Sequence, residues 1–226
     1  MAASLAYEQP TINKSWEAFL AHIPTILLIW IVTVALAAVG FGVYCVIALV
    51  GLGIGGNSGD SVVTLSSALG QLGQLPFSIL SSLVGVLFIA VPAMYYHGGE
   101  TITVNAAFAA LLKRPLRYLL AGFLFSLVAG VGLVLCVLPG LAVLLVMPIY
   151  VNRIFLTNQS ITDAFAASFQ AVYRSSNGMS FLGIEILTWL LVAVVTVCTC
   201  GLGALVAVPV STFYLQNAAY HKGLIS

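Results

Sequence analysis

Long stretches without charge constrain this chain more than any other feature. The first runs from Pro24 to Gly51 and contains no charged residue, and a helix needs about 20 mostly apolar residues to cross a bilayer. Hydrophobic types make up 62% of the 226 residues and charged types only 6%, whereas an ordinary soluble domain has about 25% charged residues. So few charges cannot keep a fold of this size in water. The pattern predicts an integral membrane protein and excludes a soluble or disordered chain.

Six segments are long and apolar enough to be predicted as membrane-spanning helices: Pro24–Gly51, Phe77–Tyr96, Leu116–Leu138, Gly140–Leu156, Met179–Gly201 and Leu202–Tyr220. Proline and glycine separate the third from the fourth, and glycine separates the fifth from the sixth, so both pairs are expected to form tight hairpins. The first segment is longer than the roughly 7–15 apolar residues of a signal peptide, so we expect it to be retained. The fold class is an all-α polytopic membrane protein, with a single membrane domain over residues 1–226.

The basic residues predict an orientation for these six spans. All seven lie on one side of the scheme: Lys14, Lys113, Arg114, Arg117, Arg153, Arg174 and Lys222. Loops that face the cytoplasm carry an excess of lysine and arginine. Both termini are therefore expected to be cytoplasmic.

Three segments outside the spans have the apolar rhythm of an amphipathic helix: Thr11–Ile23, Thr103–Arg114 and Ser160–Arg174. In the first, the apolar face comprises Ile12, Trp16, Phe19, Leu20 and Ile23. Such helices lie in the membrane interface, which predicts this position for all three on the cytoplasmic side. They share an Ala-Phe-x-Ala core at 18–21, 107–110 and 164–167.

The same order of elements recurs three times, as an amphipathic helix followed by two spans. The second span of each hairpin carries one proline, at Pro92, Pro148 and Pro209, with aromatic residues after it. The predicted units are approximately 11–97, 101–157 and 159–221, and the first contains a Gly/Ser-rich insert, 51–75, on the outer side. Units of two spans share one orientation, which predicts a pseudo-threefold axis along the membrane normal. The alternative is chance similarity among Ala-rich apolar segments.

Glu185 is the only acidic residue deep within a predicted span, about six residues into the fifth. Charged groups inside a membrane are costly and usually functional, so Glu185 is a candidate site. It could instead form a structural pair with Arg153 or anchor the helix at the interface. The three prolines could kink their spans to open a cavity or gate, or they could be packing kinks only.

A second candidate site is a ring of polar and aromatic residues at the cytoplasmic mouth. His97 and Tyr214 each lie five residues after a proline, as Arg153 does, and Glu100 follows in the next loop. Interface anchoring is the alternative. We predict no catalytic residue, metal site or cofactor, because no matching motif occurs. The net charge of +1 gives no reason to expect nucleic acid as a partner.

The Leu138-Pro139-Gly140 turn, the proline span 140–152, the amphipathic helix 160–175 and the insert after the first span together carry a family resemblance. The chain resembles six-span bacterial inner-membrane proteins of the YciC type, which are related to the membrane domain fused to some glycerophosphodiester phosphodiesterases. The resemblance implies the six-span fold and a location in the bacterial inner membrane or an equivalent internal membrane. It implies no catalytic residues.

Two functions from different classes agree with these features. The first is a non-enzymatic accessory or scaffold subunit of a larger membrane assembly, favoured by the low polarity of the spans. The second is a permease or channel for a lipid-like or weakly polar solute through a central cavity, favoured by the three prolines and Glu185. The lipid bilayer is the expected partner in both cases, and other membrane subunits are expected in the first. An intramembrane enzyme is a third and less favoured interpretation.

Overall fold

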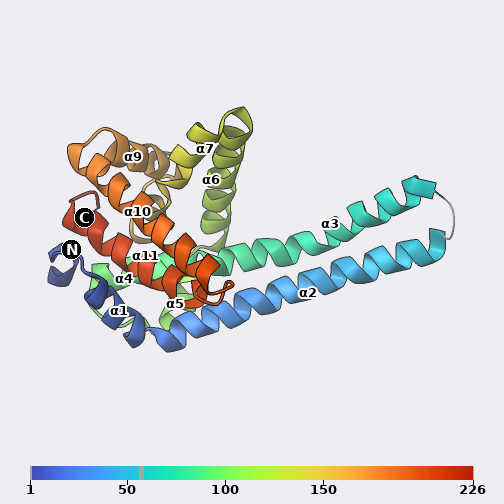
Figure 1. The fold of residues 1–226 in the computed structure, drawn as a ribbon, viewed down its shortest axis with the longest axis horizontal. Coiled ribbons are helices and arrows are strands. Elements are labelled where there is room, and N and C mark those ends of the chain that lie inside the picture. Colours follow the sequence, from blue (N-terminus) through green and yellow to red (C-terminus); the bar gives the residue numbers. More distant parts are fainter. Residues whose placement is uncertain (1, 56–58, 226) are drawn as a thin grey trace. The chain divides into compact units, whose positions relative to one another are not determined.

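The computed structural model describes the backbone of residues 2–55 and 59–225, and every regular element in these ranges is helical (Figure 1). The elements are η1 Ser4–Tyr7, α1 Ile12–Ala21, α2 Ile23–Gly55, α3 Gly59–Gly85, α4 Leu87–Gly98, α5 Val104–Lys113, α6 Pro115–Leu135, α7 Val137–Leu144, α8 Met147–Leu156, α9 Ile161–Tyr173, α10 Ser176–Cys198 and α11 Ala204–His221. The chain divides into two compact units. One comprises residues 27–85, and the other comprises the residues on either side of that range.

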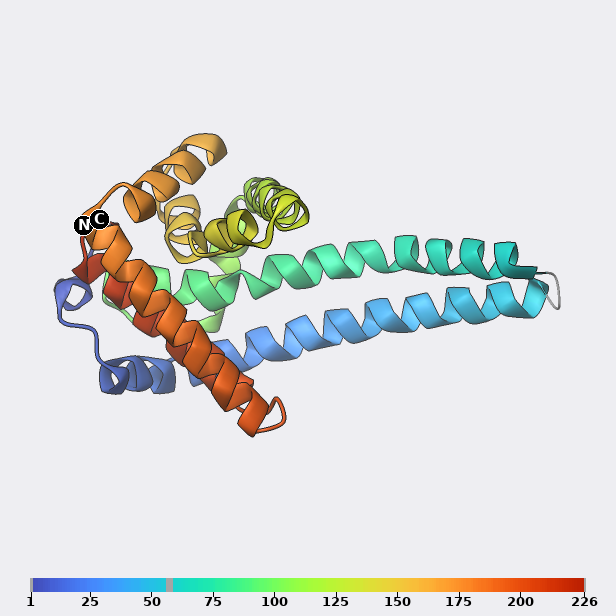
Figure 2. The same ribbon diagram turned by 45° about the horizontal axis from the view of Figure 1, so that its top comes forward.

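The smaller unit is a hairpin of two long helices, α2 and α3, which run side by side in both views (Figures 1 and 2). Glycines allow the close approach, because a Cβ at Gly40 would lie 2.8 Å from the Cβ of Phe77 and one at Gly70 would lie 2.8 Å from the Tyr44 ring. The hydroxyl of Ser81 donates to the Thr33 carbonyl at 3.2 Å. Residues 51–55 and 59–75 of the predicted insert belong to these helices.

Four helical segments in the described ranges are long and apolar enough to cross a membrane: Ile23–Gly53, Val62–Gly98, Pro115–Leu135 and Ser176–Cys198. A fifth candidate is the pair α7 and α8, which meet at a bend of 40°. The chain is thus an all-helical protein with several apolar helices of membrane-spanning length, in agreement with the class predicted from sequence.

Several predicted spans differ from single straight apolar helices. Phe77–Tyr96 crosses the boundary between α3, which ends at Gly85, and α4, which begins at Leu87. The predicted span Gly140–Leu156 is broken between Leu144 and Met147, directly before Pro148, because a proline ring clashes with the preceding helical turn. Helix α11 has 18 residues, but its C-terminal half contains Gln216 and Asn217, which lower its apolar character.

The core of the larger unit is formed by the three helices that carry the matching prolines. Helices α4, α8 and α11 each contact the other two. Pro92, Pro148 and Pro209 are all buried there. The side chains of Leu87 and Ile149 among them have no exposed surface. Further contacts pair α1 with α11, α5 with α4, and α9 with α8.

Helices form at all three segments with the Ala-Phe-x-Ala core. Thr11, Thr103 and Ser160 cap α1, α5 and α9, each accepting a hydrogen bond from a backbone N–H in the first turn. The first alanine of each core, Ala18, Ala107 or Ala164, is buried. In α1 the large apolar residues Ile12, Trp16 and Leu20 remain exposed, whereas Ser15, Ala18 and Phe19 are buried and face the protein.

Candidate functional site

A cavity of about 350 Å³ lies within the larger unit, among α8, α10 and α11. Most of its lining residues are apolar, and they include Ile89 at the edge of α4 and Met147 at the start of α8. Its polar lining side chains are Glu185, Ser211, Thr212 and Gln216, besides the indole of Trp189. Trp189 is 39% exposed, so the cavity wall reaches the surface of the protein. This volume is at the lower end of the range for small-molecule sites, about 300–1,000 Å³.

Glu185 is positioned by α10, which begins at a serine cap. The Ser175 hydroxyl oxygen accepts from the Gly178 N–H at 2.9 Å and its proton is donated to the Ala171 carbonyl at 2.7 Å. Glu185 is the tenth of the 23 residues of α10, because the helix begins at Ser176. The glutamate is therefore closer to the middle of the helix than the sequence predicts.

The Glu185 side chain is fully buried, yet its carboxyl group forms no hydrogen bond with the described residues. Arg153 does not pair with it: one Nη of that guanidinium donates to the Leu224 carbonyl at 3.1 Å. In the described part of the chain the one ion pair joins Lys14 to Glu8. The structural pair considered above for Glu185 and Arg153 is thus not formed.

A buried amide network fixes one side of the cavity. The Asn152 amide donates to the Gln216 carbonyl oxygen at 3.0 Å and to the Tyr220 hydroxyl at 3.2 Å. The Gln216 amide donates to the Pro148 carbonyl at 2.8 Å. All three side chains are at least 98% buried, so α8 and α11 are tied by satisfied polar groups. These residues were not predicted from the sequence, because an uncharged amide stands out less in an apolar span than a carboxyl group does.

The two hydroxyl groups that line the cavity already donate hydrogen bonds to the backbone. Ser211 donates to the Val208 carbonyl at 2.7 Å, and Thr212 donates to the Pro209 carbonyl at 2.8 Å. Their oxygen atoms keep lone pairs that can accept. The cavity therefore combines apolar walls with acceptors from Glu185, Ser211 and Thr212.

The predicted cytoplasmic mouth residues lie on separate elements. His97 is half-buried at the end of α4, Glu100 is exposed after it, and Tyr214 is half-buried in α11. Among the described residues, no hydrogen bond or ring contact joins these three side chains. Of the matching prolines, Pro148 lines the cavity and the other two do not.

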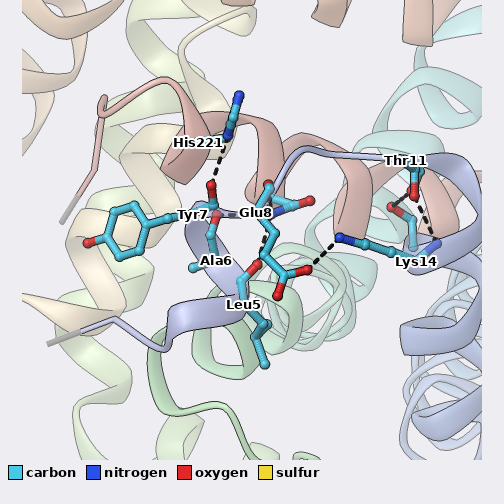
Figure 3. A network of polar contacts seen from close by, with 9 residues as sticks. Leu5, Ala6, Tyr7, Glu8, Thr11, Lys14 and His221 are labelled. Carbon is cyan, nitrogen blue, oxygen red and sulfur yellow. Dashed lines mark hydrogen bonds and ion pairs between the residues drawn. The ribbon is translucent and has the colours of Figure 1, made fainter.

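The N-terminal segment is held on α11 by a polar network (Figure 3). The Asn217 amide, which is 1% exposed, donates to the Ala6 carbonyl at 2.9 Å. The His221 Nδ1 lies 2.9 Å from the Tyr7 carbonyl, and Lys14 forms its ion pair with Glu8 (Figure 3). The backbone N–H of Ala3 donates to the Tyr96 carbonyl of α4 at 3.0 Å.

His22 links this segment to the loop after α4. Its Nε2 accepts from the Ile102 N–H at 2.9 Å, which leaves Nδ1 to donate to the Ala18 carbonyl at 2.7 Å. The ring is fully buried against Tyr95 and Phe213. Burial lowers the pKa of His22 from 6.5, although the Ala18 carbonyl partly opposes this shift. The imidazole is neutral, with its proton on Nδ1.

This geometry predicts a pH-dependent stability. Below the unfolded-state pKa of about 6.5, the unfolded chain binds a proton at His22 that the folded chain does not. The contribution of His22 to the free energy of unfolding is therefore fully present above pH 6.5 and is lost progressively as the pH falls below it. Unfolding curves in mild detergent at several pH values check this, and His22→Gln should reduce the dependence. An equal slope in both proteins would show that another group is responsible.

No protein-family model, curated protein or solved structure matches this chain. Function is therefore inferred from the geometry of the cavity.

Proposed function

We propose that this chain is a non-enzymatic integral membrane protein that binds a lipid-like or weakly polar solute in the Glu185 cavity and acts as its permease. The observation that carries the proposal is a fully buried carboxyl group that lines a cavity and has no hydrogen-bond partner in the part of the chain that the structure describes. Leaving such a group unsatisfied costs about 1–3 kcal/mol or more. A ligand that supplies the missing hydrogen-bond partner would remove this cost, which favours binding.

The walls of the cavity support a ligand with an apolar part. Val192, Ala193 and Val208 contribute aliphatic surface, and Trp189 contributes an aromatic wall that extends to the surface. Because α10 is apolar and long enough to span a membrane, that surface faces lipid in this proposal. Entry from the bilayer would then require no polar path through the spans.

The proposal is tested by photo-crosslinking in lipid nanodiscs with a diazirine-bearing alkyl lipid analogue. Crosslinks are expected at the cavity wall, at residues such as Trp189 and Val208. Ala193→Phe, which adds a ring at the exposed wall of the cavity, should remove them, whereas Leu187→Phe places the same side chain on α10 outside the cavity, at a position that is 67% exposed, and should not. Crosslinks confined to the outer faces of α6 and α10 in all three proteins would contradict the proposal.

A second candidate function is the accessory or scaffold subunit. The α2–α3 hairpin favours it, because this unit exposes apolar side chains along both helices, among them Phe41 and Leu72 at 61% and 60%. Purification in mild detergent distinguishes the two functions. A stoichiometric membrane partner that is lost when Phe41 and Leu72 are replaced by serine would favour the scaffold function.

We also propose a membrane topology with six spans in three repeats. Helix α11 is the sixth span, and the membrane is the bacterial inner membrane. The mutual packing of α4, α8 and α11 supports it, as do the contacts that pair α1, α5 and α9 with α11, α4 and α8 in cyclic order. The seven basic residues on one side of this scheme support cytoplasmic termini.

This topology predicts which cysteines react from outside the cell. Cys200 is exposed in the turn between α10 and α11, which the proposed topology assigns to the side opposite the basic residues. A membrane-impermeant maleimide added to intact spheroplasts should label it, whereas a cysteine introduced by Lys222→Cys should react only after permeabilisation. Labelling in the reverse order would contradict the orientation.

A further inference from the structure

We propose that the Glu185 cavity selects an amphiphile whose polar end is a primary ammonium group, and disfavours one with an anionic end. The inference rests on the proposed function and adds the chemical class of the solute. It follows from the hydrogen-bonding groups that the cavity still has available.

The available groups are mainly acceptors. No described residue donates a hydrogen bond to either carboxyl oxygen of Glu185, while the Ser211 and Thr212 hydroxyl groups already donate their protons to backbone carbonyls. A primary ammonium group has three N–H donors on one compact cation, which suits a cavity lined by several oxygen acceptors. A quaternary ammonium group has the charge without any donor.

The charge inventory disfavours an anion. The lining residues include one acid, Glu185, and no lysine, arginine or histidine. The second amide hydrogen of Gln216 and the Trp189 indole N–H are neutral donors, so they cannot balance the charge of a carboxylate or phosphate. An anionic group would enter a low-dielectric site that offers no cation, and a buried charge without a partner is costly.

One ligand, an alkyl chain that ends in an ammonium group, matches both the apolar walls and the acidic residue of the cavity. The ammonium group would lie at Glu185 and the chain along Val192 and Trp189, whose exposed face leads out of the cavity. The Trp189 ring adds an attraction for a cation close to its face. Burial of the methylene groups of the alkyl chain supplies the part of the binding affinity that does not depend on the polar end of the ligand.

Native mass spectrometry of the protein released from nanodiscs tests this with three probes of equal chain length. These are dodecylamine, dodecyltrimethylammonium and dodecanoate, applied near neutral pH to wild type, Glu185→Gln and Ala193→Phe. We expect dodecylamine to bind wild type at least about tenfold more tightly than dodecanoate, with the trimethyl probe weaker than the amine. Glu185→Gln should remove most of that difference and leave chain binding, because the alkyl chain contacts the walls.

The outcomes separate the two proposals. If all three probes bind wild type equally and Ala193→Phe removes them, the cavity binds chains and the ammonium inference is overturned. A preference for dodecanoate, or a preference for the amine that persists in Glu185→Gln, overturns it as well. If no probe binds, or if Ala193→Phe changes nothing, the proposed function fails and the inference fails with it.

Discussion

Replacing Gly178 with alanine is expected to destabilise the protein by about 1–3 kcal/mol. Gly178 lies in the first turn of α10, directly against the end of α9. A Cβ at this position would collide with the backbone carbonyl oxygens of Ala171 and Val172. Backbone cannot move aside as a flexible side chain can, so α9 and α10 must separate, and the Ser175 cap that bridges them is strained. Unfolding in mixed micelles, followed by tryptophan fluorescence, measures the loss.

Gly183→Ala is the matched control for this substitution. Gly183 lies on the same helix, and a Cβ there meets nothing within 4 Å. Alanine should be neutral or stabilise by up to about 1 kcal/mol, because glycine is the poorer helix former. Equal effects of the two substitutions would show that α9 and α10 do not approach as closely as described.

Replacing Glu185 with methionine is expected to stabilise the protein by about 1–3 kcal/mol. The side chain keeps a similar length and becomes apolar, and it removes two buried oxygens that have no partner. The same change should abolish selective binding of the amine probe. A gain in stability with a loss of binding is typical of a group retained for function.

The control is Glu17→Gln, which neutralises an exposed carboxylate on α1 and should change the free energy of unfolding by less than about 0.5 kcal/mol. If Glu185→Met instead lowers the stability, Glu185 has a partner in the folded protein. The structural interpretation of this residue would then replace the functional one.

The apolar helices could be predicted from sequence because each depends on a local property. A run such as 24–51 has no charge to place in water, so a long apolar helix is the expected result, and α2 covers the whole run. The helix caps at Thr11, Thr103 and Ser160 are equally local. The predicted single helix over 140–156 was wrong in its continuity, although Pro148 carried the signal for the break.

Properties that depend on neighbouring helices could not be predicted in this way. The insert 51–75 is rich in glycine and serine, which suggested a polar segment, but Gly70 and Gly73 instead allow α2 and α3 to pack closely. For α1 the apolar pattern did not reveal that Ala18, and not Trp16, faces the protein. Such choices depend on which surface is available to pack against.

The candidate site was half predictable. Glu185 was identified because charge is so scarce, and the structure places it in a cavity. The absence of a hydrogen-bond partner for Glu185 among the described residues depends on which side chains pack around it. The network of Asn152, Gln216 and Tyr220 joins residues that are separated by 64 and 68 positions in the sequence. Polar amides within apolar segments were the available signal for that network.

Carbodiimide labelling of Glu185 tests the central claim, a buried and unpartnered carboxyl group that a ligand reaches from the lipid. A hydrophobic carbodiimide adds to a protonated carboxyl group and rearranges to a stable N-acylurea, which mass spectrometry detects on the peptide. We expect the adduct at Glu185 in wild type and in Leu187→Phe, and its loss in Ala193→Phe. An unmodified Glu185 in wild type, or equal labelling in both phenylalanine variants, would contradict the account.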